Sequence, residues 1–262
     1  MNLGLVAISA VAGLMVGLTG IGSGSLTAPL LLLVFGVAPL AAVGTNLWAA
    51  AITKIVASPV HQRLRLIDWG VARRLWWGSL STSALTLLWV RFRPLNSETV
   101  RFLTASIAVV TLFSAVGMLA QKRLHQMGRR FRLDDAGRFS ALQGPMTVLA
   151  GAVLGIFVTL TSVGAGTLGT VFLAYLYPLR LTPPRLIATD IVHAIPLAVF
   201  AGSGHLLLGH VEGRLLANLL LGSVPGALIG ATLSARLPHV LLRGLLAIVL
   251  IWIGIKLWIT AI

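Results

Sequence analysis

Three ionisable side chains, Lys54, Asp190 and His193, lie inside otherwise apolar stretches of the sequence. If these stretches cross a membrane, each charge costs about 3 kcal/mol or more unless it faces a partner or an aqueous cavity. Asp190 and His193 are three residues apart and therefore share one face of a helix. The pattern predicts a buried polar site in which Lys54 holds an anion, while Asp190 and His193 carry or gate a proton.

Two other interpretations of Lys54 need no ligand. The residue lies sixteen positions into its apolar stretch, so its ammonium could reach the polar region beyond the end of that stretch. Lys54 and Asp190 could also form a structural salt bridge that joins two helices. Asn46 and Lys54, eight residues apart, nearly share a helix face, so we expect both of them near Asp190.

Two glycine-rich breaks, Gly17–Pro29 and Thr161–Thr170, interrupt apolar runs. Glycine frees the backbone from helix geometry, and at membrane depth such backbone must be buried or face a wet cavity. The N–H groups before the next helix would attract an anion, although close packing of small residues is the alternative. The residues that we predict to bind substrate are Thr19, Gly22, Ser23, Gly24, Ser25, Asn46, Lys54, Thr161, Ser162, Gly164, Gly166, Thr167 and Thr189.

The composition indicates an all-α integral membrane protein. Of the 262 residues, 57% are hydrophobic and only 10% are charged, whereas a soluble domain carries roughly 25% charged residues. The net charge of +14 comes from basic residues between apolar stretches, which is typical of cytoplasmic loops rather than of nucleic-acid binding. The sequence has no cysteine, which excludes disulfides and thiol chemistry.

An internal repeat organises the chain. At an offset of 144 residues, Thr45 aligns with Thr189, and Ser79 aligns with Ser223. Asp68 and Glu212 also correspond at this offset. We predict two homologous membrane repeats, 1–120 and 141–262, joined by a basic cytoplasmic linker at 121–140. The expected architecture has about 8 to 10 membrane segments, and the first segment of each repeat is broken or re-entrant.

Loop charge predicts how the repeats are related. The loop His61–Arg74 contains four arginines, whereas its counterpart His205–Arg214 contains one. Equivalent loops therefore face opposite sides of the membrane, which favours inverted repeats with five crossings each. Both termini would then lie outside, and Gln121–Arg138 would lie in the cytoplasm. Four crossings per half with parallel repeats is the alternative.

The motifs resemble those of a known family, the TauE/SafE sulfite exporters, which are also called toluene sulfonate uptake permeases. The resemblance covers nearly the whole chain and implies secondary transport of sulfite, sulfonates or other small sulfur-containing or carboxylated anions. Relatives commonly have Asp where this chain has Asn46. The segments that carry the resemblance are Gly17–Pro29, Val43–Asn46, Ala50–Lys54, Gly164–Gly169 and Ala188–His193.

The sequence therefore predicts a multi-pass transporter of the bacterial inner membrane that exports a small anion together with a proton. We expect no enzymatic activity, cofactor, metal or nucleic-acid partner; the partners are the anion, the lipid bilayer and, in one arrangement, a second copy of the chain. A passive anion channel is the alternative function. A hydrolase based on Ser23 and His193 is a third, but the residues around Ser23 lack the Gly-x-Ser-Gly pattern of rhomboid-type enzymes. The identity of the anion, the direction of transport and the coupling ion stay open.

Overall fold

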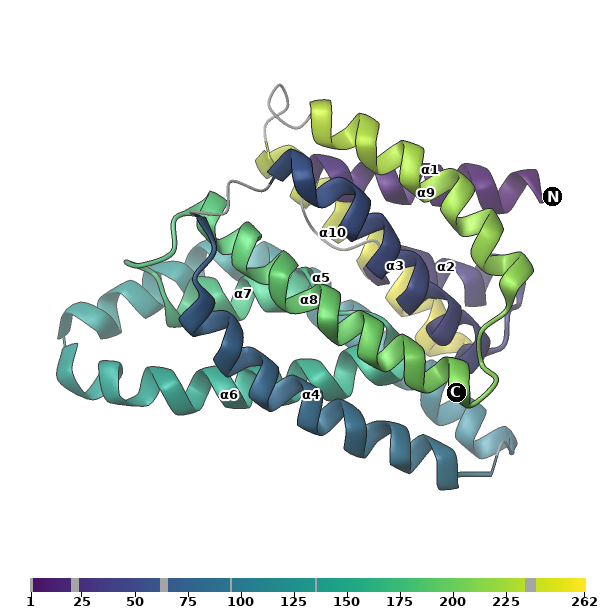
Figure 1. Ribbon diagram of the computed structural model, residues 1–262, viewed down its shortest axis with the longest axis horizontal. Helices are drawn as coiled ribbons and strands as arrows, with labels where there is room; N and C mark the ends of the chain where they lie inside the picture. The colour runs from purple at the N-terminus through teal and green to yellow at the C-terminus, as the bar shows by residue number, and fades with distance from the viewer. Residues whose placement is uncertain (1, 20–23, 62–65, 95, 135, 234–238) are drawn as a thin grey trace.

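The computed structural model describes residues 2–19, 24–61, 66–94, 96–134, 136–233 and 239–262. These residues form ten α-helices and no strand (Figure 1). The helices are α1 Leu3–Thr19, α2 Gly24–Phe35, α3 Pro39–His61, α4 Trp69–Phe92, α5 Ser97–Asp134, α6 Ala136–Thr161, α7 Thr167–Leu176, α8 Pro183–Leu207, α9 Gly213–Leu233 and α10 His239–Ala261.

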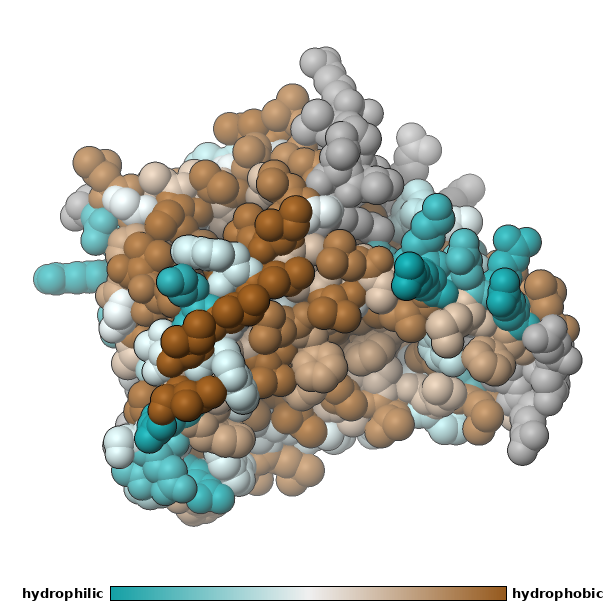
Figure 2. Space-filling view, turned by 180° about the vertical axis from the view of Figure 1, so that it is seen from behind, coloured by the Kyte–Doolittle hydropathy of each residue, from teal (hydrophilic) through white to brown (hydrophobic). Residues whose placement is uncertain are grey.

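Among the described residues, six helices are long and apolar enough to cross a membrane: α3, α5, α6, α8, α9 and α10. Shorter apolar helices occur in α1, α2 and α7. Large apolar side chains such as Trp77, Phe113 and Ile248 are exposed on the outside of the bundle, and Figure 2 shows a broad apolar face with polar groups gathered towards its ends. A lipid environment explains this surface, because soluble proteins rarely expose contiguous apolar patches of this extent. The predicted all-helical membrane fold is confirmed.

Helix α5 runs beyond its apolar part. It continues to Asp134, through most of the segment that we predicted as a linker, and α6 begins two residues later at Ala136. The residues after Ala120 are mostly Gln, Lys, Arg and Leu, which are good helix formers. The basic connection between the halves is therefore largely helical. We call this end of the bundle, where α5 passes into α6 and the loops before α4 and α8 also lie, the basic end (Figure 1).

Two helix pairs pack through glycine. A Cβ on Gly13 of α1 would lie 2.2 Å from Ser223 O of α9, and one on Gly226 of α9 would lie 2.2 Å from Ala10 O of α1. The pair α4 and α6 has the same design, since a Cβ on Gly78 would lie 2.0 Å from Val148 O. Only glycine permits this approach of two backbones, which is the usual basis of tight helix association in membranes.

Equivalent helices of the two halves have equivalent packing partners. Helix α1 packs on α9 as α6 packs on α4, and α3 packs on α9 as α8 packs on α4. The third helices of the two halves, α3 and α8, pack on each other at the centre. This central contact carries the residues that the sequence singled out.

Candidate functional site

The second glycine break has an irregular backbone between α6 and α7. Ser162 has a φ of 57°, and Gly164 and Gly166 have φ values of 110° and 109°. Leu168 N and Gly169 N both donate to Gly164 O, at 3.0 and 3.3 Å. Within the described ranges, the N–H groups of Ala165, Gly166 and Thr167 donate no hydrogen bond. The start of α7 therefore offers free donors and the positive end of a helix dipole.

Lys54 of α3 lies beside this break. Its side chain is only 5% exposed, and its ammonium has no hydrogen-bond partner among the described residues. Lys54 lines a small cavity of about 10 Å³ between α3, α8 and the break, which is room for about one water molecule. Ser162 and Ala165 of the break line the same cavity, opposite Ala194 and Ala198 of α8. Lys54 thus lies inside the bundle and does not extend to the surface.

Asp190 of α8 packs against the first turn of α7. A Cβ on Gly169 would lie 2.0 Å from Asp190 Oδ1, so only glycine leaves room for this carboxyl group. The Asp190 side chain is fully buried, and neither of its oxygens has a hydrogen-bond partner in the described part of the chain. Lys54 is close enough to act on Asp190 electrostatically, although the two do not form a direct ion pair. The predicted cation and carboxylate therefore interact electrostatically but do not form a salt bridge between the helices.

His193, one turn beyond Asp190, faces α4. Its Nε2 lies 3.0 Å from Ser79 Oγ, and its backbone carbonyl accepts a hydrogen bond from Trp76 Nε1 at 3.3 Å. Its Nδ1 is buried without a partner among the described residues, and the charge of Lys54 also acts on the ring. Sequence reasoning missed Ser79 as a site residue, although the alignment of Ser79 with Ser223 marked the position. Ser223 bonds Thr53 Oγ1 of α3 at 2.8 Å.

Asn46 contacts the break. Its side-chain amide donates to Ser162 Oγ at 3.0 Å, which ties α3 to the irregular backbone two turns from Lys54. The repeat-equivalent residues Asn46 and Asp190 therefore both contact the second break or the helix that follows it. No group of three or more His, Asp or Glu side chains in the described residues is placed to hold a metal ion.

Other predicted site residues are engaged elsewhere. Thr161 Oγ1 donates to Phe157 O and accepts from Val163 N, so this side chain shapes the break itself. Thr167 Oγ1 donates to Ser114 of α5, and Thr189 Oγ1 accepts from Asp68 N. Ser25, near the start of α2, is buried.

Residues 20–23 of the first break lie outside the described residues, and Gly22 and Ser23 are among them. Of Thr19 and Gly24, the structure describes the backbone alone. The predictions for these four residues stay predictions.

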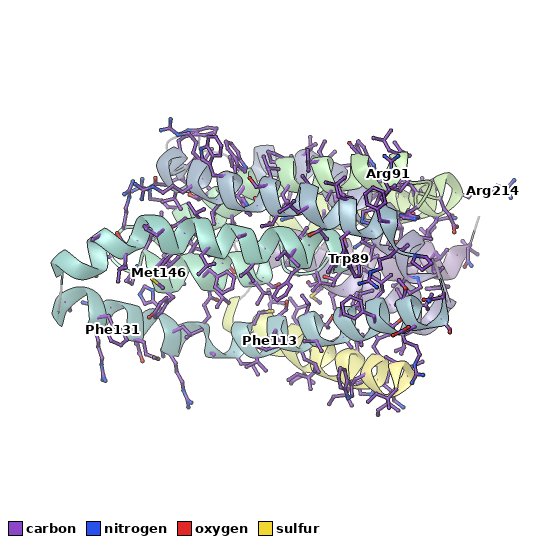
Figure 3. The ribbon with its side chains drawn as sticks, turned by 90° about the horizontal axis from the view of Figure 1, so that it is seen from below. Trp89, Arg91, Phe113, Phe131, Met146 and Arg214 are labelled. Atoms are coloured by element: carbon purple, nitrogen blue, oxygen red, sulfur yellow. The ribbon has the colours of Figure 1, made fainter. Side chains whose placement is uncertain are left out.

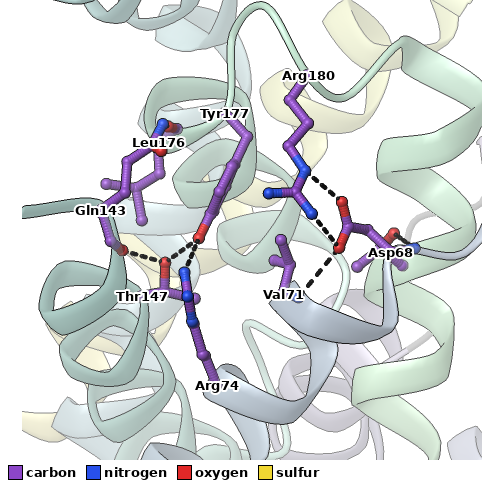
Figure 4. Close-up of polar contacts among 9 residues, drawn as sticks. Asp68, Val71, Arg74, Gln143, Thr147, Leu176, Tyr177 and Arg180 are labelled. Carbon is purple, nitrogen blue, oxygen red and sulfur yellow. Dashed lines mark hydrogen bonds and ion pairs between the residues drawn. The ribbon is translucent and has the colours of Figure 1, made fainter. Parts of the chain in front are cut away.

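A polar network at the basic end was also missed by sequence reasoning (Figure 4). Arg180, in the loop between α7 and α8, donates from Nε and Nη2 to the two carboxylate oxygens of Asp68, at 2.6 and 2.9 Å. The hydroxyl of Tyr177 lies 3.5 Å from Arg74 Nη1 and 2.8 Å from Thr147 Oγ1. These contacts join α4 and the loops before α4 and α8 to α6.

An all-helical bundle with an apolar outer surface, a broken helix and isolated charges at its centre has the features of a membrane transporter. The family model of the sulfite exporter TauE/SafE matches residues 5–257. The chain is also 33% identical over 223 residues to "Probable membrane transporter protein YjnA" of Bacillus subtilis (strain 168), covering 83% of this chain and 84% of that protein. No solved structure gives a significant match. The chain belongs to the sulfite exporter TauE/SafE family and is a multi-pass membrane transporter.

Proposed function

We propose that this transporter exports a small oxyanion of sulfur, or a similar sulfonate or carboxylate, and that a proton is coupled to the movement. The observation that carries the proposal is that Lys54 lines a cavity and that its buried ammonium has no hydrogen-bond partner among the described residues. A buried cation without a close partner is costly, so an anion that enters this cavity gains a strong charge-assisted contact. The hydroxyl of Ser162 and the free N–H groups at the start of α7 supply further donors.

The proton follows from the charge balance of the site. In this mechanism Lys54 and Asp190 balance each other's charge when no substrate is bound, because each acts electrostatically on the other. When an anion binds Lys54, the site gains a negative charge, and protonation of Asp190 restores the balance. His193 is one turn away with a free Nδ1, so it is the natural group to pass this proton. Binding of the anion and uptake of the proton then favour each other.

The size of the cavity favours a carrier over a channel. It holds about one water molecule, whereas an oxyanion such as sulfite is larger. Substrate can enter only if α3 and α8 move relative to the break. A protein that must rearrange for each substrate can couple that movement to a proton, and a permanently open channel cannot.

Inverted repeats are part of the proposal. Asp68 N donates to Thr189 Oγ1 at 3.0 Å, and Glu212 N donates to Thr45 Oγ1 at 3.0 Å. These contacts are equivalent at the 144-residue offset. Thr45 lies near the start of α3 and Thr189 near the start of α8, and Figure 1 shows that these two helices run antiparallel. An inverted two-fold relation produces this pattern. The positive-inside rule then puts the basic end in the cytoplasm, and we place the protein in the bacterial inner membrane.

The test is export of sulfite from proteoliposomes by purified Lys54→Met protein. We expect the variant to lose transport, because methionine keeps the length of the side chain and removes its charge. Lys256→Met is the matched control, since Lys256 is exposed near the end of α10 and should be dispensable. Normal transport by Lys54→Met would show that the central charge does not bind substrate, and this mechanism would then be wrong.

A second variant separates the carrier from the channel. Asp190→Asn should still bind sulfite but should no longer respond to a pH gradient. In wild-type liposomes, an imposed pH gradient should drive sulfite above its equilibrium concentration. If sulfite only equilibrates across the membrane whatever gradient is imposed, the protein is a passive channel.

A further inference from the structure

A large cavity lies at the basic end, separate from the site at Lys54. It measures about 700 Å³ and is formed by α5, α7, the loop before α8, the start of α8 and α10. Ligand cavities in proteins have volumes of about 300–1,000 Å³, so this one is large enough for part of a lipid. Most of its lining is apolar, and none of the described lining residues is acidic. The proposed transport mechanism makes no use of it.

The depth of the cavity follows from the length of α5. Arg101 and Lys122 are separated by 21 residues with no charged side chain between them. At 1.5 Å per residue this is about 31 Å, close to the thickness of about 30 Å of the hydrocarbon core. Lys122 therefore lies at the boundary between acyl chains and headgroups. The cavity extends from Lys122 to Met118, one turn deeper, and so crosses this boundary.

The lining changes from polar to apolar across the same boundary. Lys122 and His125 of α5 and Thr182 of the loop before α8 supply polar groups at the shallow level. His125 is fixed by its Nδ1, which lies 3.2 Å from Ala174 O. Met118 and Leu186 line the cavity with apolar surface.

The cavity also opens sideways towards lipid. Leu119 and Leu179 line it and are each 55% exposed. Along the same helix, Phe113 and Phe131 lie at one edge of the bundle in Figure 3, away from Arg91 and Arg214 at the opposite end. Phe113, six residues before Leu119 in α5, is 61% exposed. A molecule can therefore enter from the bilayer without passing through water.

We propose that this cavity binds an anionic phospholipid, with its phosphate at Lys122 and one acyl chain along Met118 and Leu186. Charge favours an anionic headgroup over a zwitterionic one, because the rim carries Lys122 and the described lining carries no acidic residue. The apolar lining favours a lipid over a free anion, since a small oxyanion would leave most of this surface unsatisfied. The site is independent of the substrate and of the proposed proton coupling.

The experiment is native mass spectrometry of the purified protein with phosphatidylglycerol or phosphatidylcholine. We expect phosphatidylglycerol to be retained preferentially and glycerol phosphate not to displace it. Lys122→Gln should weaken phosphatidylglycerol binding about five-fold, as expected for one interfacial lysine. The matched control is Arg123→Gln, which removes a neighbouring exposed charge that does not line the cavity.

Filling the cavity tests the proposal independently of charge. A Cβ on Gly244 of α10 would meet no described atom within 4 Å, so leucine can be placed there without moving the backbone. Gly244→Leu should abolish binding of both lipids, whereas Ile248→Phe, at a lipid-facing position of the same helix, should not. Equal retention of the two lipids by the wild type, or full binding by Gly244→Leu, would overturn the proposal. Displacement of phosphatidylglycerol by glycerol phosphate would instead make the cavity an entrance for soluble anions.

Discussion

Two regions of the molecule, the loop before α4 and the loop before α9, share one type of hydrogen bond and differ in charge. We call these two regions the corners. At the basic end, Asp68 N donates to Thr189 Oγ1; at the opposite end, Glu212 N donates to Thr45 Oγ1, at the same distance of 3.0 Å. The Asp68 carboxylate is buried, forms two bonds to Arg180 and accepts from Val71 N at the start of α4. Glu212 is exposed, and it forms no ion pair with the described residues.

The difference has a cause in the sequence. The position equivalent to Arg180 is Gly36, which has a φ of 61° and cannot take a long side chain without backbone strain. The opposite corner therefore has no basic residue at that position to pair with Glu212. The common hydrogen bond holds each loop against the core, while the ion pair at the basic end adds a contact that one half of the repeat alone possesses. The two corners therefore share the hydrogen bond from the backbone to threonine, and they differ in the ion pair.

The largest effect is expected from Asp68→Ala. This change removes the cap of α4, worth about 1 kcal/mol, and an ion pair to the half-exposed Arg180, worth about 1 kcal/mol. We expect a loss of about 2 kcal/mol in unfolding free energy, seen as a lower melting temperature in detergent. Glu212→Ala is the matched control and should change stability by less than about 0.5 kcal/mol. Equal losses in the two variants would show that the corners are energetically alike.

A smaller effect is expected where the corners agree. Thr189→Val and Thr45→Val each remove one hydrogen bond to a backbone N–H and keep the shape of the side chain. Each variant should lose about 1 kcal/mol, and their melting temperatures should fall by similar amounts. Thr189→Val should also leave the affinity for sulfite unchanged if Thr189 only holds the loop. A selective loss of sulfite binding would instead return Thr189 to the substrate site that the sequence predicted.

The smallest expected effect is on the stability of the protein at low pH, and it should arise at the corner that contains Glu212. His210 lies in the loop between α8 and α9, and burial lowers the pKa of its imidazole. The folded protein therefore disfavours the charged ring. Stability from this residue is present above the ordinary histidine pKa of about 6.5 and is lost as the pH falls through the lowered value.

Between about pH 7 and pH 5, the melting temperature of His210→Gln should fall less than that of the wild type. The variant lacks the imidazole that takes up a proton when the protein unfolds. The groups near His210 are His205 of α8, whose Nδ1 lies 3.2 Å from His210 Nδ1, and Glu212, two residues on. Melting curves across this pH range provide the measurement. Identical pH profiles for the variant and the wild type would contradict the prediction.

The sequence by itself determined the class of the protein. Inside a bilayer, each segment must satisfy its own backbone polar groups, so the constraint acts within short stretches of sequence. For this reason low charge content, apolar runs of membrane length and paired glycine breaks are visible in the sequence alone. The rarity of charges in those runs also identified Lys54, Asp190 and His193, since each one is costly wherever the runs pack. The hydrophobic pattern did not show how far helix α5 extends, because the helix continues through good helix formers after the apolar residues stop.

Only the tertiary structure decided which of these residues meet. The contact of Asp190 with Gly169 joins the consecutive helices α7 and α8. The contact of His193 with Ser79 and the bond between Asn46 and Ser162 join residues that are more than 100 positions apart. The ion pair of Asp68 and Arg180 joins two loops that are 112 residues apart. Such contacts depend on the rotation of each helix about its axis and on the distance at which glycines let two helices pack. The hydrophobic periodicity of one segment determines neither of them. For this reason the sequence alone identified the candidate residues, and packing determined which of them meet.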